Sequence, residues 1–200
     1  MSKINAVCVY CGSSPGTEPA FIAAAEKLGA ILAENGVRLV YGGGSTGLMG
    51  ALSRAVIAHG GKATGIIPEF LTTRERPQQL GQDMIVTRDM HERKQKMFER
   101  ADAFIALPGG IGTLEEIVEQ LTWAQLGRHK KPILFANING YWDPLLALFA
   151  HMREQDFVPD ALRVNFLVAD RVEGILPTLW EAALGVAAAE ETMAIPAERM

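Results

Sequence analysis

Short apolar segments alternate with amphipathic ones along most of the chain. The apolar segments are strand-sized and end at turn-forming residues, which is the pattern of buried β-strands. They comprise 4–10, 37–41, 62–68, 83–87, 102–108, 131–137 and 164–170. Helical patterns follow most of them, over 18–35, 48–59, 88–101, 114–126, 143–155 and from Val172 onward. Residues 69–81 are polar, rich in turn formers and without a clear pattern.

This alternation predicts β-α-β units, and therefore a parallel sheet with helices on both faces. We expect a single Rossmann-like, doubly wound α/β domain of about seven mostly parallel strands. The expected nucleotide-binding domain spans residues 1–185. Residues 186–200 are rich in Ala and Glu and are expected to form a flexible or helical tail.

Composition narrows the class of protein. The 200 residues are 48% hydrophobic and 21% charged, which is typical of a globular domain and unlike a disordered chain. The formal net charge of −4 argues against a nucleic-acid partner, because such proteins usually carry a basic surface. The apolar runs fall short of the roughly 20 residues that cross a bilayer, and the N-terminal sequence lacks the form of a signal peptide. We expect a cytoplasmic protein with no membrane partner.

The two cysteines, Cys8 and Cys11, form a CxxC motif, which invites a redox or zinc interpretation. However, the motif ends an apolar strand and runs into GSSPG instead of opening a helix. The sequence has no second CxxC, and its four histidines show no ligand spacing. A structural role is favoured, and we expect neither a metal nor a cofactor.

Two glycine-rich turns carry the clearest sign of a ligand. GGGSTG (42–47) follows the second strand, and PGGIGT (108–113) follows the strand at 102–108. Both fall at the carboxyl edge of the sheet, where open α/β folds bind ligands. Backbone N–H groups and helix N-termini there can hold a phosphate without net positive charge. The second turn lacks the Lys of a nucleoside-triphosphate loop, so a monophosphate fits better.

The first turn also matches a dinucleotide fingerprint. Gly42, Gly44 and Gly47 have the GxGxxG spacing, and Glu69 ends the next strand, where a ribose-binding acid would lie. A nicotinamide-dependent oxidoreductase is therefore one alternative, although it leaves the second turn without a role. A tight turn that needs glycine for close backbone approach is another.

Glu116 has two interpretations. With Thr113 three residues before it, it could complete a capping box, or its carboxylate could be catalytic. The helical pattern places it away from the expected core stripe and on the same side as Trp123. A large aromatic residue there suggests cover by a second subunit. The expected core stripe consists of Leu114, Ile117, Val118 and Leu121.

Two cations occupy an apolar stripe. Arg93 and Lys94 lie three and four residues after Met90, on the inward side that Met97 and Ala101 mark. Their charged heads could reach water while their stems stay inside. Alternatively, both could point into a ligand site at the edge of the sheet, where Arg suits phosphate or carboxylate.

Four motifs together resemble the Lonely Guy family. They are PGGIGTLEE (108–116), MHERK (90–94), TWAQLG (122–127) and YGGGSTGLMG (41–50). The resemblance implies a cytokinin riboside 5′-monophosphate phosphoribohydrolase, which releases free base and ribose 5-phosphate and commonly accepts AMP. It also implies a homodimer with sites near the subunit interface. No lysine has a pyridoxal-phosphate setting, so the older label of lysine decarboxylase has no support here.

The resemblance also assigns site residues. It makes Arg93 and Glu116 the catalytic pair. The resemblance makes Glu75, Lys94, the segment 110–116 and Thr122 substrate-binding positions. Together with Arg93 and further residues of the two glycine turns, the expected substrate-binding set is Gly43, Gly44, Ser45, Glu75, Arg93, Lys94, Gly109, Gly110, Ile111, Gly112, Thr113, Leu114, Glu115, Glu116 and Thr122. Ile111, where the family often has an aromatic residue, and residues 76–89 depart from the family pattern. They leave open the choice between an isopentenyl-type base and adenine.

A carrier function is the second alternative. Proteins of similar fold hold molybdopterin-type cofactors by the phosphate, and the same glycine turns could serve that purpose. Glu116 would then have no catalytic role.

Overall fold

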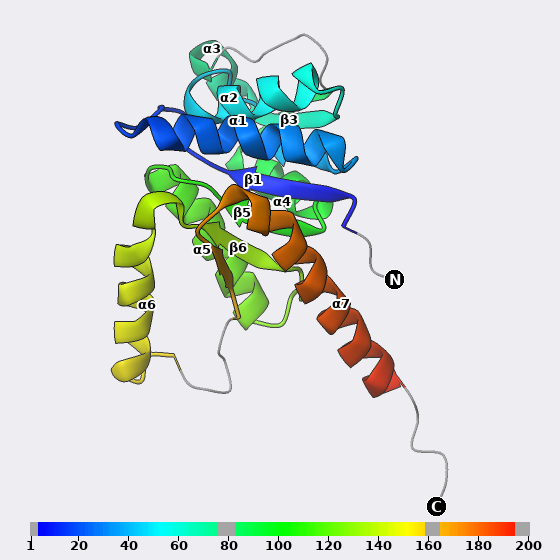
Figure 1. Cartoon of the computed structure of the whole chain (residues 1–200), viewed down its shortest axis with the longest axis vertical. Helices are drawn as coiled ribbons and strands as arrows, with labels where there is room; N and C mark the ends of the chain where they lie inside the picture. The colour runs from blue at the N-terminus through cyan, green and yellow to red at the C-terminus, as the bar shows by residue number, and fades with distance from the viewer. Residues whose placement is uncertain (1–3, 76–82, 159–164, 195–200) are drawn as a thin grey trace, which may run out of the picture.

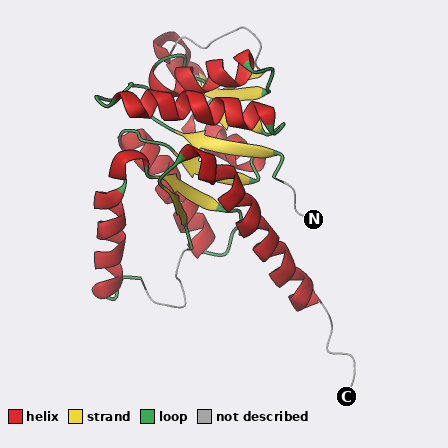
Figure 2. Cartoon of the chain, in the orientation of Figure 1, coloured by secondary structure: helices red, strands yellow, loops and turns green. Residues whose placement is uncertain are grey.

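The computed structural model describes residues 4–75, 83–158 and 165–194. Its centre is a seven-stranded, wholly parallel sheet with the order β4-β3-β2-β1-β5-β6-β7 (Figures 1 and 2). The strands are β1 (Ala6–Tyr10), β2 (Arg38–Tyr41), β3 (Ala63–Pro68), β4 (Asp83–Thr87), β5 (Ala103–Ala106), β6 (Ile133–Ala136) and β7 (Leu167–Ala169). The predicted strands and the predicted doubly wound fold are confirmed.

Helices cover both faces of the sheet. One core packs beneath α1 (Pro19–Glu34), α2 (Gly47–Ala58) and α7 (Ile175–Ala194). The other packs beneath α4 (Met90–Glu99), α5 (Ile111–Gln125) and α6 (Asp143–Glu154). The short helices are α3 (Thr72–Glu75), η1 (Glu69–Leu71), η2 (Ile138–Gly140) and η4 (Val172–Gly174). In Figure 1, α7 runs away from the sheet toward the C-terminus, and the division expected at residue 185 stays a prediction.

The central strand separates the two cysteines. Side chains alternate along a strand, so Cys8 packs in the core beneath α4 and α5, whereas Cys11 packs in the core beneath α1 and α2. Both thiols are buried, neither forms a disulfide, and burial raises the pKa of Cys8. Because the two side chains lie on opposite faces of the sheet, this CxxC does not form a redox pair in the fold.

The strand order also fixes where a ligand crevice forms. The chain proceeds outward from β1 to β4 on one side, and then returns to place β5 on the other side of β1. The turns that follow β1 and β5 therefore meet at the switch point of the sheet, the usual ligand position in this fold. The backbone N–H of Gly12 donates to the carbonyl of Pro108 across this point at 3.0 Å.

No helix among the described residues is long and apolar enough to cross a membrane.

Candidate active site

The start of α4 is fixed by its own side chains. The Asp89 carboxylate accepts from the Glu92 N–H at 2.8 Å, and the Glu92 carboxylate accepts from the Arg88 N–H at 2.9 Å. The bonds from the Arg88 backbone and side chain, with Lys96, lower the pKa of Glu92 to about 2. This reciprocal cap sets the rotation of α4, and so directs the next residue, Arg93, toward the sheet.

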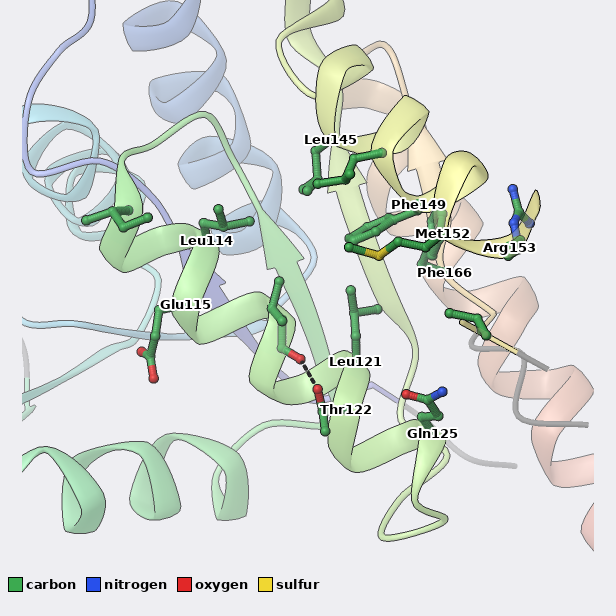
Figure 3. Close-up of a pocket in the computed structure, with 14 residues that line it drawn as sticks. Leu114, Glu115, Leu121, Thr122, Gln125, Leu145, Phe149, Met152, Arg153 and Phe166 are labelled. Atoms are coloured by element: carbon green, nitrogen blue, oxygen red, sulfur yellow. Dashed lines mark hydrogen bonds between the residues drawn. The ribbon is translucent and has the colours of Figure 1, made fainter. Parts of the chain in front are cut away.

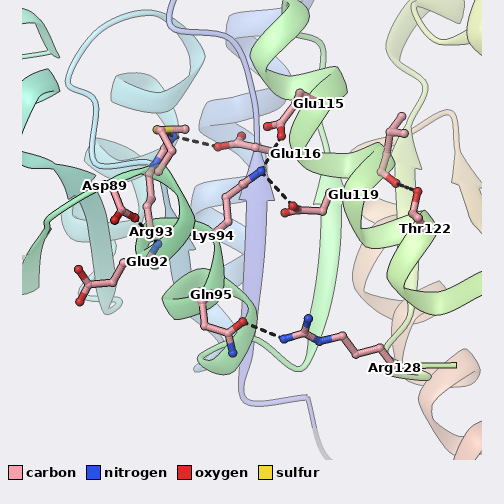
Figure 4. A network of polar contacts seen from close by, with 12 residues as sticks. Asp89, Glu92, Arg93, Lys94, Gln95, Glu115, Glu116, Glu119, Thr122 and Arg128 are labelled. Atoms are coloured by element: carbon pink, nitrogen blue, oxygen red, sulfur yellow. Dashed lines mark hydrogen bonds and ion pairs between the residues drawn. The ribbon is translucent and has the colours of Figure 1, made fainter. Parts of the chain in front are cut away.

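Arg93 is buried and engaged on several sides, with only 8% of its side chain exposed. Its Nε donates to the Ile66 carbonyl at 3.1 Å, and its Nη1 lies 3.1 Å from Glu116 Oε1 and 3.7 Å from Met90 Sδ (Figure 4). The guanidinium therefore does not extend into water, and the snorkelling alternative is wrong for this residue. A buried cation of this kind needs a partner, and Glu116 is that partner.

Glu116 is not part of a capping box. Helix α5 begins at Ile111 with Gly110 as its N-cap and no side-chain cap, so Thr113 and Glu116 are its third and sixth residues. The Glu116 side chain is 10% exposed and reaches sideways to α4. The predicted core stripe is also partly wrong: Ile117 is fully buried, but Val118 is 36% exposed. The reason is that Val118 lines an apolar hollow between α5 and α6.

Lys94 lies between two further carboxylates of α5. Its Nζ is 2.6 Å from Glu115 Oε1 and 2.9 Å from Glu119 Oε1, and its side chain is 15% exposed. Burial lowers the pKa of Lys94, but its bonds to Glu115 and Glu119 outweigh burial and raise it overall. The α4–α5 seam thus holds two cations against three carboxylates, since Arg93 pairs with Glu116 beside it (Figure 4).

A small cavity opens beside the N-terminus of α5. It has a volume of about 250 Å³ and is lined by the turn after β1, the turn after β5, Phe21, Leu48 and Tyr141. The Tyr141 hydroxyl donates to the Gly109 carbonyl at 2.5 Å, which fixes that peptide plane. A side chain at Gly110 would meet nothing within 4 Å. The first N–H groups of a helix have no partners within the helix, and Gly110 leaves open space beside this cavity, so the cavity can receive an anion.

The first glycine turn is packed against protein atoms instead. The Gly12 carbonyl accepts from the N–H groups of Leu48 and Met49 at 3.0 and 3.3 Å, which occupies the start of α2. Gly43 has a φ of +80° and lies against Ile67 and Met84. These contacts favour the close-approach explanation of the turn over the dinucleotide fingerprint. Gly44 is buried in the same turn, and the Ser45 carbonyl accepts from Arg54 at 3.0 Å.

Most of the remaining predicted site residues lie along α5. A second, larger hollow of about 560 Å³ lies between α5 and α6 and is mainly apolar (Figure 3). The predicted residues among its lining are Ile111, Leu114, Glu115 and Thr122. Gly109 and Thr113 lie in contact, whereas Gly112 is open. Glu75 ends α3, and its side chain lies outside the described residues.

Trp123 gives no support for a subunit contact. The Arg128 guanidinium stacks over its ring at 3.9 Å, and Phe98 packs edge-on at 5.2 Å. The chain itself thus covers part of this aromatic residue, which is half-buried. The apolar hollow, lined in part by Ile111 at 82% exposure and Leu148 at 46%, is the surface that a partner could cover.

Contributors to the cavity that the sequence did not predict include the CGSSPG turn (11–16) and Tyr141. CGSSPG is a third turn at the carboxyl edge of the sheet. This position, directly after a predicted strand, is the feature from which its role could have been predicted. Its role depends on β5 lying next to β1, which local patterns do not reveal. In the described residues, no group of three or more His, Cys, Asp or Glu side chains is placed to hold a metal ion.

Known proteins of similar fold give the structural context. A Moco carrier protein of Chlamydomonas reinhardtii has a TM-score of 0.68 at 21% identity, covering 92% of this chain and 99% of its own. A molybdenum cofactor binding protein of Rippkaea orientalis has a TM-score of 0.66 at 20% identity, covering 90% and 97%. At this identity the likeness shows the shared fold alone.

Sequence comparison is more specific. A family model described as "Possible lysine decarboxylase" matches residues 49–179. The probable cytokinin riboside 5′-monophosphate phosphoribohydrolase LOG4 of Oryza sativa subsp. japonica is 47% identical over 90% of this chain and 78% of its own length. The cytokinin riboside 5′-monophosphate phosphoribohydrolase LOG7 of Arabidopsis thaliana is also 47% identical, over 90% and 83%. The chain therefore belongs to the Lonely Guy family, as its motifs predicted.

Proposed function

We propose that the chain is an N-glycosidase that hydrolyses cytokinin riboside 5′-monophosphates, and also AMP. Water cleaves the bond between base and ribose, giving free base and ribose 5-phosphate. Relatives at 47% identity carry the name of this activity. The observation that carries the proposal is the buried ion pair between Arg93 of α4 and Glu116 of α5, because the N-terminus of α5 borders a cavity suited to phosphate.

The phosphate is held by the start of α5. The N-terminus of a helix carries partial positive charge, and the first amides of α5 have no side-chain cap. Gly110 lines the cavity, and Glu116 follows it by six residues, about 9 Å along the helix axis. One rigid helix thus fixes the phosphate relative to the carboxylate. Such orientation can lower a barrier by roughly 7–11 kcal/mol in favourable cases.

Glu116 then serves the reaction at the sugar. As the bond to the base breaks, its electron pair leaves with the base and positive charge builds on the ribose. The Glu116 carboxylate stabilises this charge and accepts a proton from the water that attacks C1′, and the departing base takes up a proton. Arg93 orients the carboxylate through their 3.1 Å contact.

The proposed assembly is a homodimer with its sites near the interface. The apolar hollow between α5 and α6 supports this, because it includes Glu115, which pairs with Lys94 in the α4–α5 seam. We expect Leu148→Glu, which places a charge on this exposed surface, to shift the protein from dimer to monomer in sedimentation experiments. A wild-type protein that stays monomeric at all concentrations would contradict the proposal.

The test is product release. The protein is incubated with AMP, with isopentenyladenosine 5′-monophosphate and with the matching ribosides, and free base is measured by chromatography. We expect base from the monophosphates and little from the ribosides. Folded protein that releases no base, but copurifies with a pterin, would favour the carrier function instead. NAD-dependent hydride transfer would favour the oxidoreductase.

A further inference from the structure

Gly42 borders the Arg93 guanidinium directly. It follows β2 and is buried. A Cβ atom built at this position would lie 2.3 Å from Arg93 Nη2, with Met49 Sδ at 3.2 Å and Arg93 Cζ at 3.5 Å as the next nearest atoms. The space that a side chain would need at residue 42 is therefore filled by the end of Arg93.

We propose that Gly42 is a positioning residue for the proposed hydrolysis, and that its missing side chain determines where the Arg93 guanidinium lies. Through the ion pair, this position sets the direction of the Glu116 carboxylate. The expected effect of Gly42 on catalysis rests on the proposed function. The expected effect of Gly42 on the position of Arg93 does not depend on that function.

Backbone strain does not explain this glycine. The φ of Gly42 is not positive, whereas its neighbour Gly43 has a φ of +80°. An alanine at residue 42 is therefore compatible with the backbone, and its main conflict is with Arg93. The substitution Gly42→Ala tests the space beside the guanidinium and leaves the conformation of the turn unchanged.

Arg93 has little freedom to move aside. The guanidinium is planar, so a push on Nη2 also displaces Nε and Nη1. These atoms bind the Ile66 carbonyl and Glu116, each at 3.1 Å. Relieving a 2.3 Å contact requires a shift of about 1 Å, which would take at least one of these bonds beyond hydrogen-bonding distance. A misplacement of about 1 Å can reduce an enzymatic rate by about 100-fold.

The experiment compares Gly42→Ala in two backgrounds. In the wild-type background we expect kcat/KM for AMP to fall about 100-fold, mainly through kcat. In an Arg93→Lys background, Nη2 is absent, so the added methyl group should change the remaining activity and the melting temperature by little. Gly174→Ala is the matched control, because a Cβ there meets nothing within 4 Å and its φ is not positive.

Each outcome decides the proposal. Gly42→Ala with wild-type activity overturns it, as does the same loss in the Arg93→Lys background. If Gly42→Ala fails to fold, recovery of folding by Arg93→Lys supports the proposal, and failure of both variants overturns it. If the wild-type protein releases no base, the proposed function fails separately. A crystal structure of Gly42→Ala then tests the effect on Arg93 alone. A displaced guanidinium supports the proposal, and a guanidinium in its wild-type position contradicts it.

Discussion

The two glycine-rich turns look alike in sequence but have opposite surroundings. In the turn between β2 and α2, protein atoms fill the space that glycine leaves: a Cβ on Gly47 would lie 2.3 Å from the Ser13 backbone. In the turn between β5 and α5, a Cβ on Gly110 would meet nothing within 4 Å. Neither of the two helices that follow has a side-chain cap, but the Gly12 carbonyl accepts from the Leu48 and Met49 N–H groups at the start of α2.

This difference separates glycines that make room for other parts of the protein from glycines that border the ligand cavity. In the first turn, glycine allows protein segments to approach one another and supports the turn after β1. In the second, Gly109 also packs against protein atoms, but Gly110 leaves the backbone beside the cavity open to a ligand. The sixth residue of each helix shows the same contrast between packing and chemistry. In α2 it is Leu52, a buried apolar residue, and in α5 it is Glu116. Chemistry is therefore expected only at the second turn.

Gly47→Ala should have the largest effect, and on stability. A non-glycine residue at its φ of +56° costs about 1–3 kcal/mol, and overpacking against Ser13 costs about 1–3 kcal/mol more. The melting temperature should fall by roughly 6–12 °C for a loss near 3 kcal/mol in a chain of this size. Calorimetry measures this. An unchanged melting temperature would show that the first turn is not packed as described.

Glu116→Gln should have the next largest effect, and on turnover. The amide keeps the shape of the side chain but can neither accept the proton nor balance positive charge on the sugar. We expect kcat to fall about 100-fold or more, measured by base release from AMP. Leu52→Met, at the matching position of α2, is the control and should retain activity. A fully active Glu116→Gln would remove Glu116 from the chemistry.

Gly110→Ala should affect binding with little change in stability, the reverse of Gly47→Ala. Its φ of −86° suits alanine, and the methyl group would project into open space beside the cavity. We expect KM for AMP to rise about 10-fold, with the melting temperature nearly unchanged. Unaltered KM would place the phosphate elsewhere.

His129, near the C-terminal end of α5, should give the smallest effect. Burial lowers the pKa of His129 below its ordinary value of 6.5. As the pH falls below this value, the unfolded chain takes up the proton more readily than the folded one, so stability decreases. His129→Gln should reduce the fall in melting temperature as the pH is lowered below about 6.5. If the melting temperatures of both proteins depend on pH in the same way, His129 does not contribute to the pH dependence of stability. The substitution should leave the pH dependence of activity unchanged.

Local patterns were sufficient for the fold. The apolar segments and glycine stops predicted the strands within a few residues, because buried parallel strands have a strong local signal. The inward direction of Arg93 was also visible in the spacing from Met90. What pairs with Arg93 was not, since Glu116 lies 23 positions later and meets it only through the packing of α4 on α5.

The start of α5 shows why the remainder of the site was harder to predict. Thr113 and Glu116 match a capping box in sequence, but the N-cap is Gly110, so the helix begins three residues earlier than that box requires. This shift directs Glu116 toward Arg93. Likewise, the contribution of CGSSPG depends on the strand order, which brings β5 next to β1.

The most direct test measures ligand geometry together with chemistry. A crystal of Glu116→Gln soaked with AMP should show the phosphate at the start of α5, in the cavity with Gly110, and the substituted side chain at position 116 facing C1′ of the ribose. The wild-type protein should release adenine from the same AMP. A phosphate bound at the Gly42–Gly47 turn, or a side chain at position 116 directed away from the ribose, would contradict the account.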